Sequence, residues 1–161
     1  MIIRKTIMAD WDVVLSVYAC AREQMRKNGN PSQWGENRPH ENSIRQDIEN
    51  GNHYIIEEDG QIVGVFAFVL GDDPTYAIIE GKWLNDEKYG TLHKIASNGK
   101  VSGILAYTLA FCESIIANVR VDTHRDNVIM RHLLQKYGYQ ECGIIYVDDG
   151  TPRIAYQKTT I

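Results

Sequence analysis

The chain has 161 residues, of which 24% are charged, and its formal net charge at pH 7 is -4. An acidic chain lacks the positive field that attracts nucleic acid, so we predict no nucleic-acid partner. This length suffices for one domain that buries about 70% of the surface exposed by its unfolded chain. We therefore expect a single domain over residues 1–161.

Three cysteines, Cys20, Cys112 and Cys142, stand far apart and in apolar surroundings. Their odd number and wide spacing favour reduced thiols in the core of a cytoplasmic protein, and we expect no metal site. The residues after Met1 include no apolar run long enough for a signal peptide or a membrane span, so we predict no membrane partner.

The first part of the chain combines a short strand with helical periodicity. Residues 2–5 are typical of a strand, and apolar residues then recur at spacings of three and four, which predicts a helix with one buried face. These residues are Trp11, Val14, Tyr18, Ala21 and Met25. Asp10 is expected to cap this helix and Asn28-Gly29 to end it. A loop over residues 30–39 and a second helix over residues 41–50 follow.

Two β-rich runs come next, over residues 53–57 and 62–70. They are joined through Asp59-Gly60, a strong signal of a tight hairpin, so two antiparallel strands are predicted. Residues 71–88 begin with a break in the second strand and continue as a mixed segment. The chain is expected to return to the sheet near Tyr89.

Residues 92–103 combine an extended segment with a short polar loop that contains two glycines, and an apolar run without helix breakers follows over residues 104–117. Strand, loop and helix are predicted in that order. The first N–H groups of a helix have no partner of their own, and glycines let a phosphate approach them, so the arrangement suits anion capture. Lys100 adds positive charge. The alternative is an ordinary strand-to-helix turn.

The last part of the chain adds a strand over residues 119–122 and a helix that Asp126 or Asn127 caps. A closing hairpin follows, with strands over residues 139–147 and 153–158. The predicted order is βααββ, then βαβα, then ββ. This order indicates the α/β class, with a mixed, mostly antiparallel sheet flanked by about four helices.

The order of elements and two motifs resemble the GCN5-related N-acetyltransferase (GNAT) family, whose members transfer an acyl group from acetyl-CoA to an amine. Residues 95–103, Ile-Ala-Ser-Asn-Gly-Lys-Val-Ser-Gly, resemble the family's pyrophosphate loop. Val-Asp-Thr-His-Arg-Asp-Asn at 121–127, running into Leu-Leu-Gln-Lys-Tyr-Gly-Tyr at 133–139, resembles its second cofactor segment. The loop departs from the family pattern at Asn98, where Arg or Gln is usual, and at Val101, where Gly is usual.

The resemblance covers essentially the full length and implies a single-domain acyl-CoA N-acyltransferase fold with acetyl-CoA as donor and coenzyme A as product. It implies cofactor binding by the loop, by the strand before it and by the start of one helix. The residues concerned are Ile95, Ala96, Ser97, Asn98, Gly99, Lys100, Val101, Ser102, Gly103 and Asn127. Asn127 is alternatively an ordinary N-cap.

Acetyl transfer to an amine needs a base for the amine proton and a proton source for the leaving thiolate. His93 is the first candidate base, because strand alternation puts His93, Ile95 and Ser97 on one face. A structural histidine is the alternative. Leu134 occupies the position where many family members carry a tyrosine acid, so Tyr137 is the next candidate acid, with core packing as its alternative.

Trp34 and Trp83 lie in two loop-like segments that the resemblance places on the acceptor side. Each could stack on a substrate or attract an ammonium group, and each has core packing as its alternative. The moderate length of these segments favours a small-molecule amine. The predicted function is acetyl-CoA-dependent N-acetyl transfer by direct attack in a ternary complex. A non-catalytic acyl-CoA sensor with the same fold is the alternative, and the sequence leaves a homodimer open.

Overall fold

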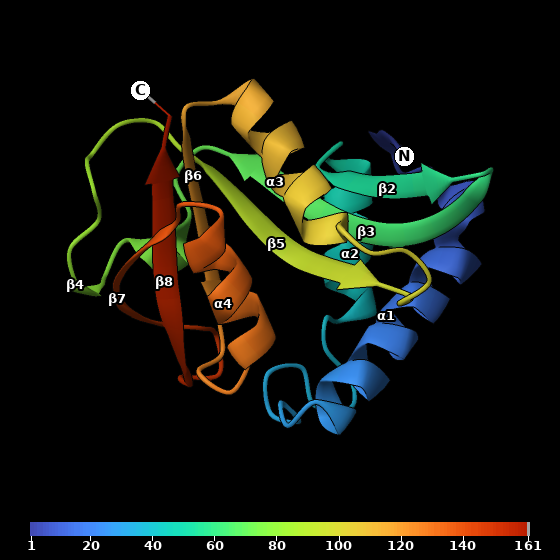
Figure 1. The fold of residues 1–161 in the computed structure, drawn as a ribbon, viewed down its shortest axis with the longest axis horizontal. Helices are drawn as coiled ribbons and strands as arrows, with labels where there is room; N and C mark the ends of the chain where they lie inside the picture. The colour runs from blue at the N-terminus through green and yellow to red at the C-terminus, as the bar shows by residue number, and fades with distance from the viewer. Residues whose placement is uncertain (161) are drawn as a thin grey trace. The chain divides into compact units, whose positions relative to one another are not determined.

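The computed structural model describes residues 1–160, and its chain divides into two compact units (Figure 1). The first unit contains Met1–Phe68 and His93–Leu105. The second contains Val69–Leu92 and the chain from Ala106 onward. Among the described helices, none has the length and apolar character that crossing a membrane requires.

Three antiparallel strands form the sheet of the first unit together with part of a fourth. These strands are β1 (Ile2–Lys5), β2 (His53–Glu58) and β3 (Gln61–Leu70). The β2–β3 connection has positive φ at both Asp59 (51°) and Gly60 (77°). This is the geometry of the two-residue turn that an Asp-Gly pair favours, so the predicted hairpin is confirmed.

Two helices of the first unit, α1 (Trp11–Lys27) and α2 (Glu41–Glu49), share one hydrophobic core with its sheet. The buried face of α1 follows the predicted periodicity. The core residues are Val14, Val17, Tyr18, Ala21, Ile44, Ile55, Val65 and Ala96. Since Ala96 lies in β5 (Gly90–Ser97), this core fixes the second half of that strand against α1.

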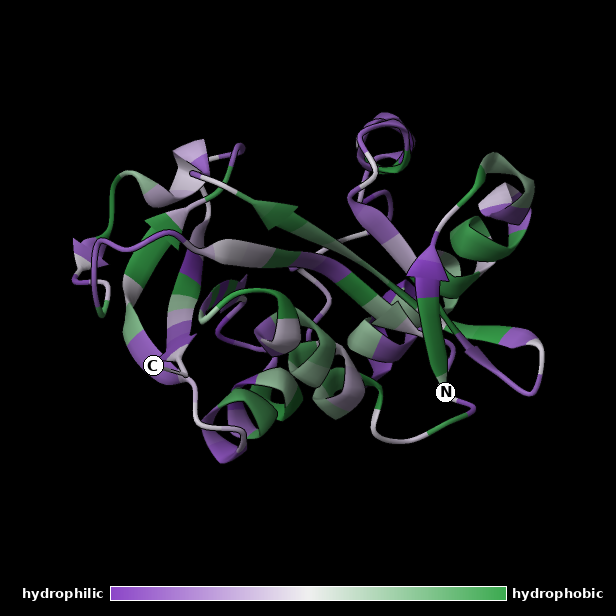
Figure 2. Ribbon diagram, turned by 90° about the horizontal axis from the view of Figure 1, so that it is seen from above, coloured by the Kyte–Doolittle hydropathy of each residue, from purple (hydrophilic) through white to green (hydrophobic). Residues whose placement is uncertain are grey.

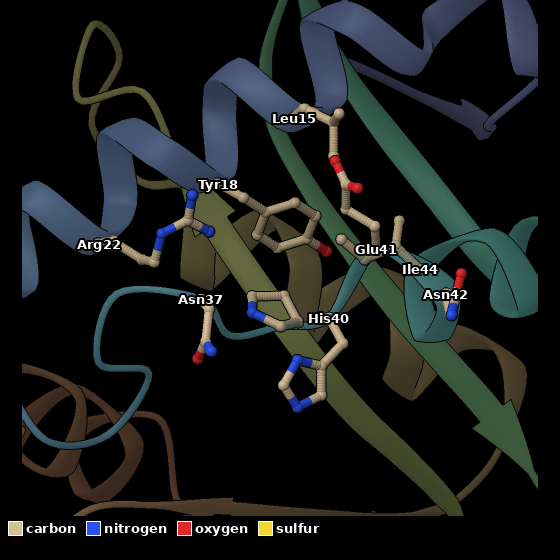
Figure 3. Close-up of a pocket in the computed structure, with 9 residues that line it drawn as sticks. Leu15, Tyr18, Arg22, Asn37, His40, Glu41, Asn42 and Ile44 are labelled. Carbon is tan, nitrogen blue, oxygen red and sulfur yellow. The ribbon is translucent and has the colours of Figure 1, made fainter.

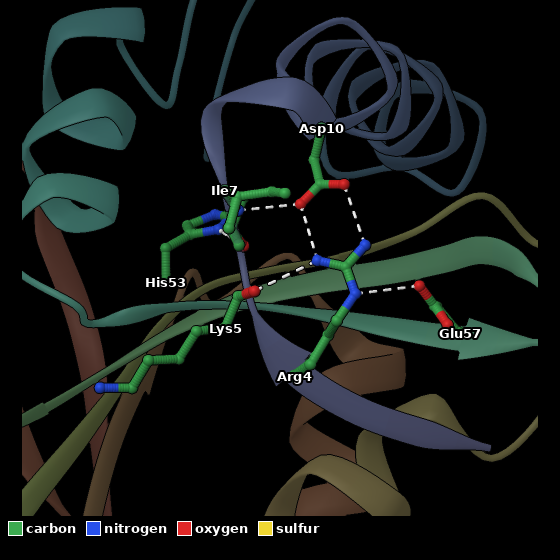
Figure 4. Close-up of polar contacts among 7 residues, drawn as sticks. Arg4, Lys5, Ile7, Asp10, His53 and Glu57 are labelled. Carbon is green, nitrogen blue, oxygen red and sulfur yellow. Dashed lines mark hydrogen bonds and ion pairs between the residues drawn. The ribbon is translucent and has the colours of Figure 1, made fainter.

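Asp10 does not cap α1 through its side chain, contrary to the sequence-based expectation. Its carboxylate accepts two hydrogen bonds of 2.9 Å from the guanidinium of Arg4 and a third from the N–H of Ile7 (Figure 4). The strand β1 runs from a hydrophobic start to a hydrophilic end (Figure 2). Arg4, in this strand, also donates to Glu57 at 3.0 Å (Figure 4). A guanidinium competes better for the carboxylate than a lone helix N–H because the contact is bidentate and charged.

The second unit contains the first half of β5 and four further strands. These are β4 (Glu80–Gly81), β6 (Asn118–Thr123), β7 (Gln140–Tyr146) and β8 (Pro152–Thr159). Gly90–Leu92 pair in parallel with Val119–Val121, whereas the pairs β4–β7, β6–β8 and β7–β8 are antiparallel. The full strand order is β1-β2-β3-β5-β6-β8-β7-β4, which confirms the mixed, mostly antiparallel sheet.

The short strand β4 is absent from the sequence-based expectation. It pairs Gly81 with Gly143 of β7, and a Cβ on either glycine would collide with a carbonyl oxygen of the facing strand. Two residues are too few for a periodicity to show. The pairing depends on two glycines that lie far apart in the sequence.

The α-helices of the second unit are α3, which begins at Ile104 and ends at Ile115, and α4 (Val128–Lys136). Both have the predicted positions. Leu109 and Cys112 of α3 and Leu134 of α4 are buried. Burial raises the pKa of the Cys112 thiol, so Cys112 is a packing residue, as predicted.

Candidate active site

The strand β5 is irregular at Lys94, which has a left-handed backbone (φ 54°). The Lys94 carbonyl accepts a 2.8 Å hydrogen bond from the hydroxyl of Tyr18 on α1. The alternation that grouped His93 with Ile95 assumes an extended backbone at Lys94, so it does not hold across this residue. His93 itself is half-buried.

Tyr18 also belongs to a buried chain of side chains. Its hydroxyl lies 3.0 Å from Nε2 of His53, and Nδ1 of His53 lies 2.7 Å from the hydroxyl of Thr6. Because Tyr18 has one proton and donates it to Lys94, it must accept from His53. His53 therefore carries its proton on Nε2, and Thr6 donates to Nδ1.

The charge state of this chain follows from its burial. Burial lowers the pKa of His53 to about 4 and raises the pKa of Tyr18 well above its usual value. Both side chains are neutral near pH 7. The chain Thr6–His53–Tyr18 thus supports the left-handed turn at Lys94 by a directed series of hydrogen bonds.

Replacing Tyr18 with phenylalanine is expected to destabilise the protein by about 1–3 kcal/mol, because the Lys94 carbonyl and the Nε2–H of His53 lose their partner. Urea unfolding monitored by circular dichroism measures this loss. Replacing the exposed Tyr146 with phenylalanine is the matched control, since its hydroxyl contacts Glu80 at the surface and its loss should leave stability nearly unchanged. Equal stability of the two variants would contradict the structural role of Tyr18.

The loop from Asn98 to Gly103 begins with two local side-chain contacts. The N–H of Gly99 donates to the hydroxyl of Ser97, and the N–H of Lys100 donates to the side-chain oxygen of Asn98, both at 3.0 Å. The backbone N–H of Asn98 also bonds the carbonyl of Val63 on β3 at 3.1 Å. Asn98 thus shapes the loop.

The second half of the loop has backbone N–H groups that form no hydrogen bond within the described protein. Within the described residues, the N–H groups of Val101, Ser102 and Gly103 donate to no protein atom. Gly103 has a left-handed backbone (φ 82°), and α3 begins directly after it. Successive open N–H groups before a helix, with Lys100 beside them, fit a phosphate group, as the resemblance implies for the coenzyme.

The second unit holds the other predicted cofactor residue and the candidate acid. Asn127 is the N-cap of α4, and its side-chain oxygen accepts from the N–H of Met130 at 3.2 Å. A pantetheine contact through Asn127 stays a prediction. Tyr137 is the half-buried C-cap residue of α4, and Leu134 is fully buried. The proton-donor role of Tyr137 also stays a prediction.

The two predicted substrate tryptophans belong to different units. Trp34 packs edge-on against Tyr18, with ring centroids 5.7 Å apart, beside the core of the first unit. Trp83 donates its indole N–H to the carbonyl of Tyr76, and the guanidinium of Arg120 lies 4.0 Å from its ring. The Trp83 ring therefore already attracts a cation of the protein itself.

A cavity of about 540 Å³ opens in the first unit between α1, the following loop and the start of α2 (Figure 3). Its lining residues are Leu15, Tyr18, Arg22, Asn37, Pro39, His40, Glu41, Asn42 and Ile44. Sequence reasoning missed this set. The spacing of Leu15, Tyr18 and Arg22 marks one helix face, but no local signal shows that the loop turns back over that face.

The structure brings His93, the predicted cofactor residues 95–103 and the cavity into the first unit, because β5 passes beneath α1. Among residues 1–160, no group of His, Cys, Asp or Glu side chains is placed to hold a metal ion.

No protein-family model and no curated protein matches this sequence. Solved structures do match. An acetyltransferase of the GNAT family from Streptococcus agalactiae is 36% identical, with a TM-score of 0.86 over 99% of this chain and 95% of that chain. A GNAT-family acetyltransferase from Listeria monocytogenes is 20% identical, with a TM-score of 0.73 over 98% of this chain and 94% of that chain.

A ribosomal-protein-alanine N-acetyltransferase from Brucella melitensis is also 20% identical, with a TM-score of 0.66 over 99% of both chains. The two structures at 20% identity show the fold alone, which is that of the N-acetyltransferases. The likeness to the Streptococcus structure, at 36% identity over nearly the whole chain, goes further. The chain belongs to the GNAT family of acetyltransferases.

Proposed function

We propose that the protein is an acetyl-CoA-dependent N-acetyltransferase that modifies a small-molecule amine. The observation that carries this proposal is the loop before α3, with its three open N–H groups from Val101 to Gly103. These groups and Lys100 would hold the pyrophosphate of the coenzyme, and the backbone at Ile95 and Ser97 would hold its pantetheine arm. The coenzyme supplies the acetyl group as a thioester.

The amine attacks the acetyl carbonyl directly in a ternary complex, so a C–N bond forms as the C–S bond breaks. His93 is proposed to take the amine proton, and Tyr137 is proposed to protonate the departing thiolate. No covalent residue is needed, which agrees with the burial of Cys112.

Replacing Gly103 with valine is expected to weaken coenzyme A binding about tenfold or more, because a branched residue resists the left-handed backbone that aligns the loop. Calorimetric titration with coenzyme A measures this. Gly29, at the end of α1, is a matched control because its φ of 81° is nearly the same and it lies outside the loop. Unchanged affinity in the Gly103→Val variant would contradict the loop assignment.

The identity of residue 134 favours a second candidate function, a non-catalytic acyl-CoA sensor. By the resemblance, many family members carry a tyrosine acid at this position, and this chain carries the buried Leu134 instead. Thiol release from acetyl-CoA across a panel of amines separates the two functions. Turnover above background with any amine supports the enzyme. Tight coenzyme A binding without turnover supports the sensor, and no binding contradicts both.

A further inference from the structure

The cavity in the first unit contains a cation and an anion that do not pair with each other. Nη1 of Arg22 donates to the carbonyl of Arg38 at 3.2 Å, and no carboxylate of residues 1–160 contacts this guanidinium. The carboxylate of Glu41 forms no ion pair or hydrogen bond with a described side chain. Two opposite charges therefore face one cavity, and neither forms an ion pair with a described residue.

Figure 3 shows Arg22 and Glu41 on either side of the Tyr18 ring. Leu15 and Arg22 are seven residues apart on α1, which is two helical turns or about 10 Å. This length of α1 sets the scale of a ligand that could lie along this face of the helix.

The cavity wall also contains apolar side chains, beside the polar Asn37, His40 and Asn42. Tyr18 and Ile44 are each 1% exposed and form part of the lining with Leu15. A volume of about 540 Å³ lies in the range of sites for small molecules. A ligand that matches this surface has a positive end, an apolar middle and a negative end.

We propose that the cavity binds an amino carboxylate, a compound in which a short apolar segment joins an amine to a carboxylate. Arg22 binds the carboxylate through its planar guanidinium, Glu41 attracts the amine in its ammonium form, and the apolar segment lies over Tyr18. The assignment rests on the proposed function, because the amine of this ligand is the acetyl acceptor. Arg22 disfavours a diamine, whose second end is also positive.

Calorimetric titration of the full chain with ω-amino carboxylates of increasing chain length, and with their methyl esters, tests the assignment. Each ester keeps the amine and the apolar segment but has no negative charge. At the best chain length, the acid is expected to bind about tenfold or more tightly than its ester. Equal affinity of acid and ester at every chain length would overturn the proposal, as would no binding at all.

The Arg22→Gln variant should lose the preference for the acid while it binds the ester as the wild type does. Arg26 is a matched control on the same helix, because it pairs with Glu23 at 2.9 Å and lies outside the lining. Arg26→Gln should keep the full preference. A preference that survives Arg22→Gln would overturn the role of Arg22, and thermal unfolding shows whether the variants are folded.

Thiol release from acetyl-CoA separates this inference from the proposed function. Turnover of amines without any preference for a carboxylate would contradict the cavity assignment, but it would support the proposed N-acetyltransferase activity. Selective binding of amino carboxylates without thiol release would support the cavity assignment and count against catalysis.

Discussion

Replacing His93 with alanine is expected to lower the turnover number about a hundredfold or more, because the amine would lose the base that removes its proton. His93 lies in β5 directly before the left-handed Lys94, whose carbonyl is held by Tyr18. Thiol release at saturating acetyl-CoA, measured across a range of pH, gives the turnover number. Coenzyme A affinity should change little, since the loop is untouched.

His132 provides the matched control for this experiment. It is exposed on α4, so His132→Ala should keep wild-type turnover. A His93→Ala variant with wild-type turnover at every pH would remove His93 from the mechanism. A variant that loses stability and coenzyme A affinity together would instead identify His93 as a structural residue.

Acidification from pH 7 to pH 4.5 is expected to reduce the free energy of unfolding by about 2 kcal/mol through His53 alone. Burial lowers the pKa of His53 to about 4 in the folded protein, with Lys94 lowering it further and Asp47 and Asp10 opposing the shift. The unfolded chain takes up this proton below about pH 6.5. The unfolded state therefore binds more protons between these two values, and stability falls as pH falls.

Urea unfolding at both pH values measures the loss. The variant His53→Gln removes the titrating group and should flatten the pH dependence, whereas His132→Gln, on the exposed side of α4, should keep it. Burial lowers the pKa of His124 as well. Acidification therefore reduces the free energy of unfolding further, in the wild type and in both variants. An unchanged pH dependence in the His53→Gln variant would contradict the assigned neutral state.

Local patterns in the sequence predicted most of the fold. The spacing of three and four along residues 11–25 gave the buried face of α1, and Asp59-Gly60 placed a two-residue hairpin. Gly103 before an apolar run marked the start of α3. Each of these signals lies within a few neighbouring residues, where backbone preference and periodicity act directly.

The predicted capping role of Asp10 shows where local reasoning fails. An aspartate before a helix is a good cap when no better partner is near. Here Arg4 and Ile7 bind its carboxylate and hold its pKa below the usual range, with the Arg4 contact as the main cause. The guanidinium comes from β1, and its approach depends on how that strand packs beside α1.

The sequence by itself determined the order of the elements, the buried helix faces and the loop from Asn98 to Gly103, because each depends on neighbouring residues. Only the tertiary structure decided that Tyr18, 76 positions before Lys94, binds the carbonyl of that left-handed residue. The same contacts decided that the neutral ring of His53 carries its proton on Nε2. The tertiary structure also decided that Arg22 and Glu41 face one cavity without pairing. These features require contacts between segments far apart in the chain, which packing creates and no local preference encodes.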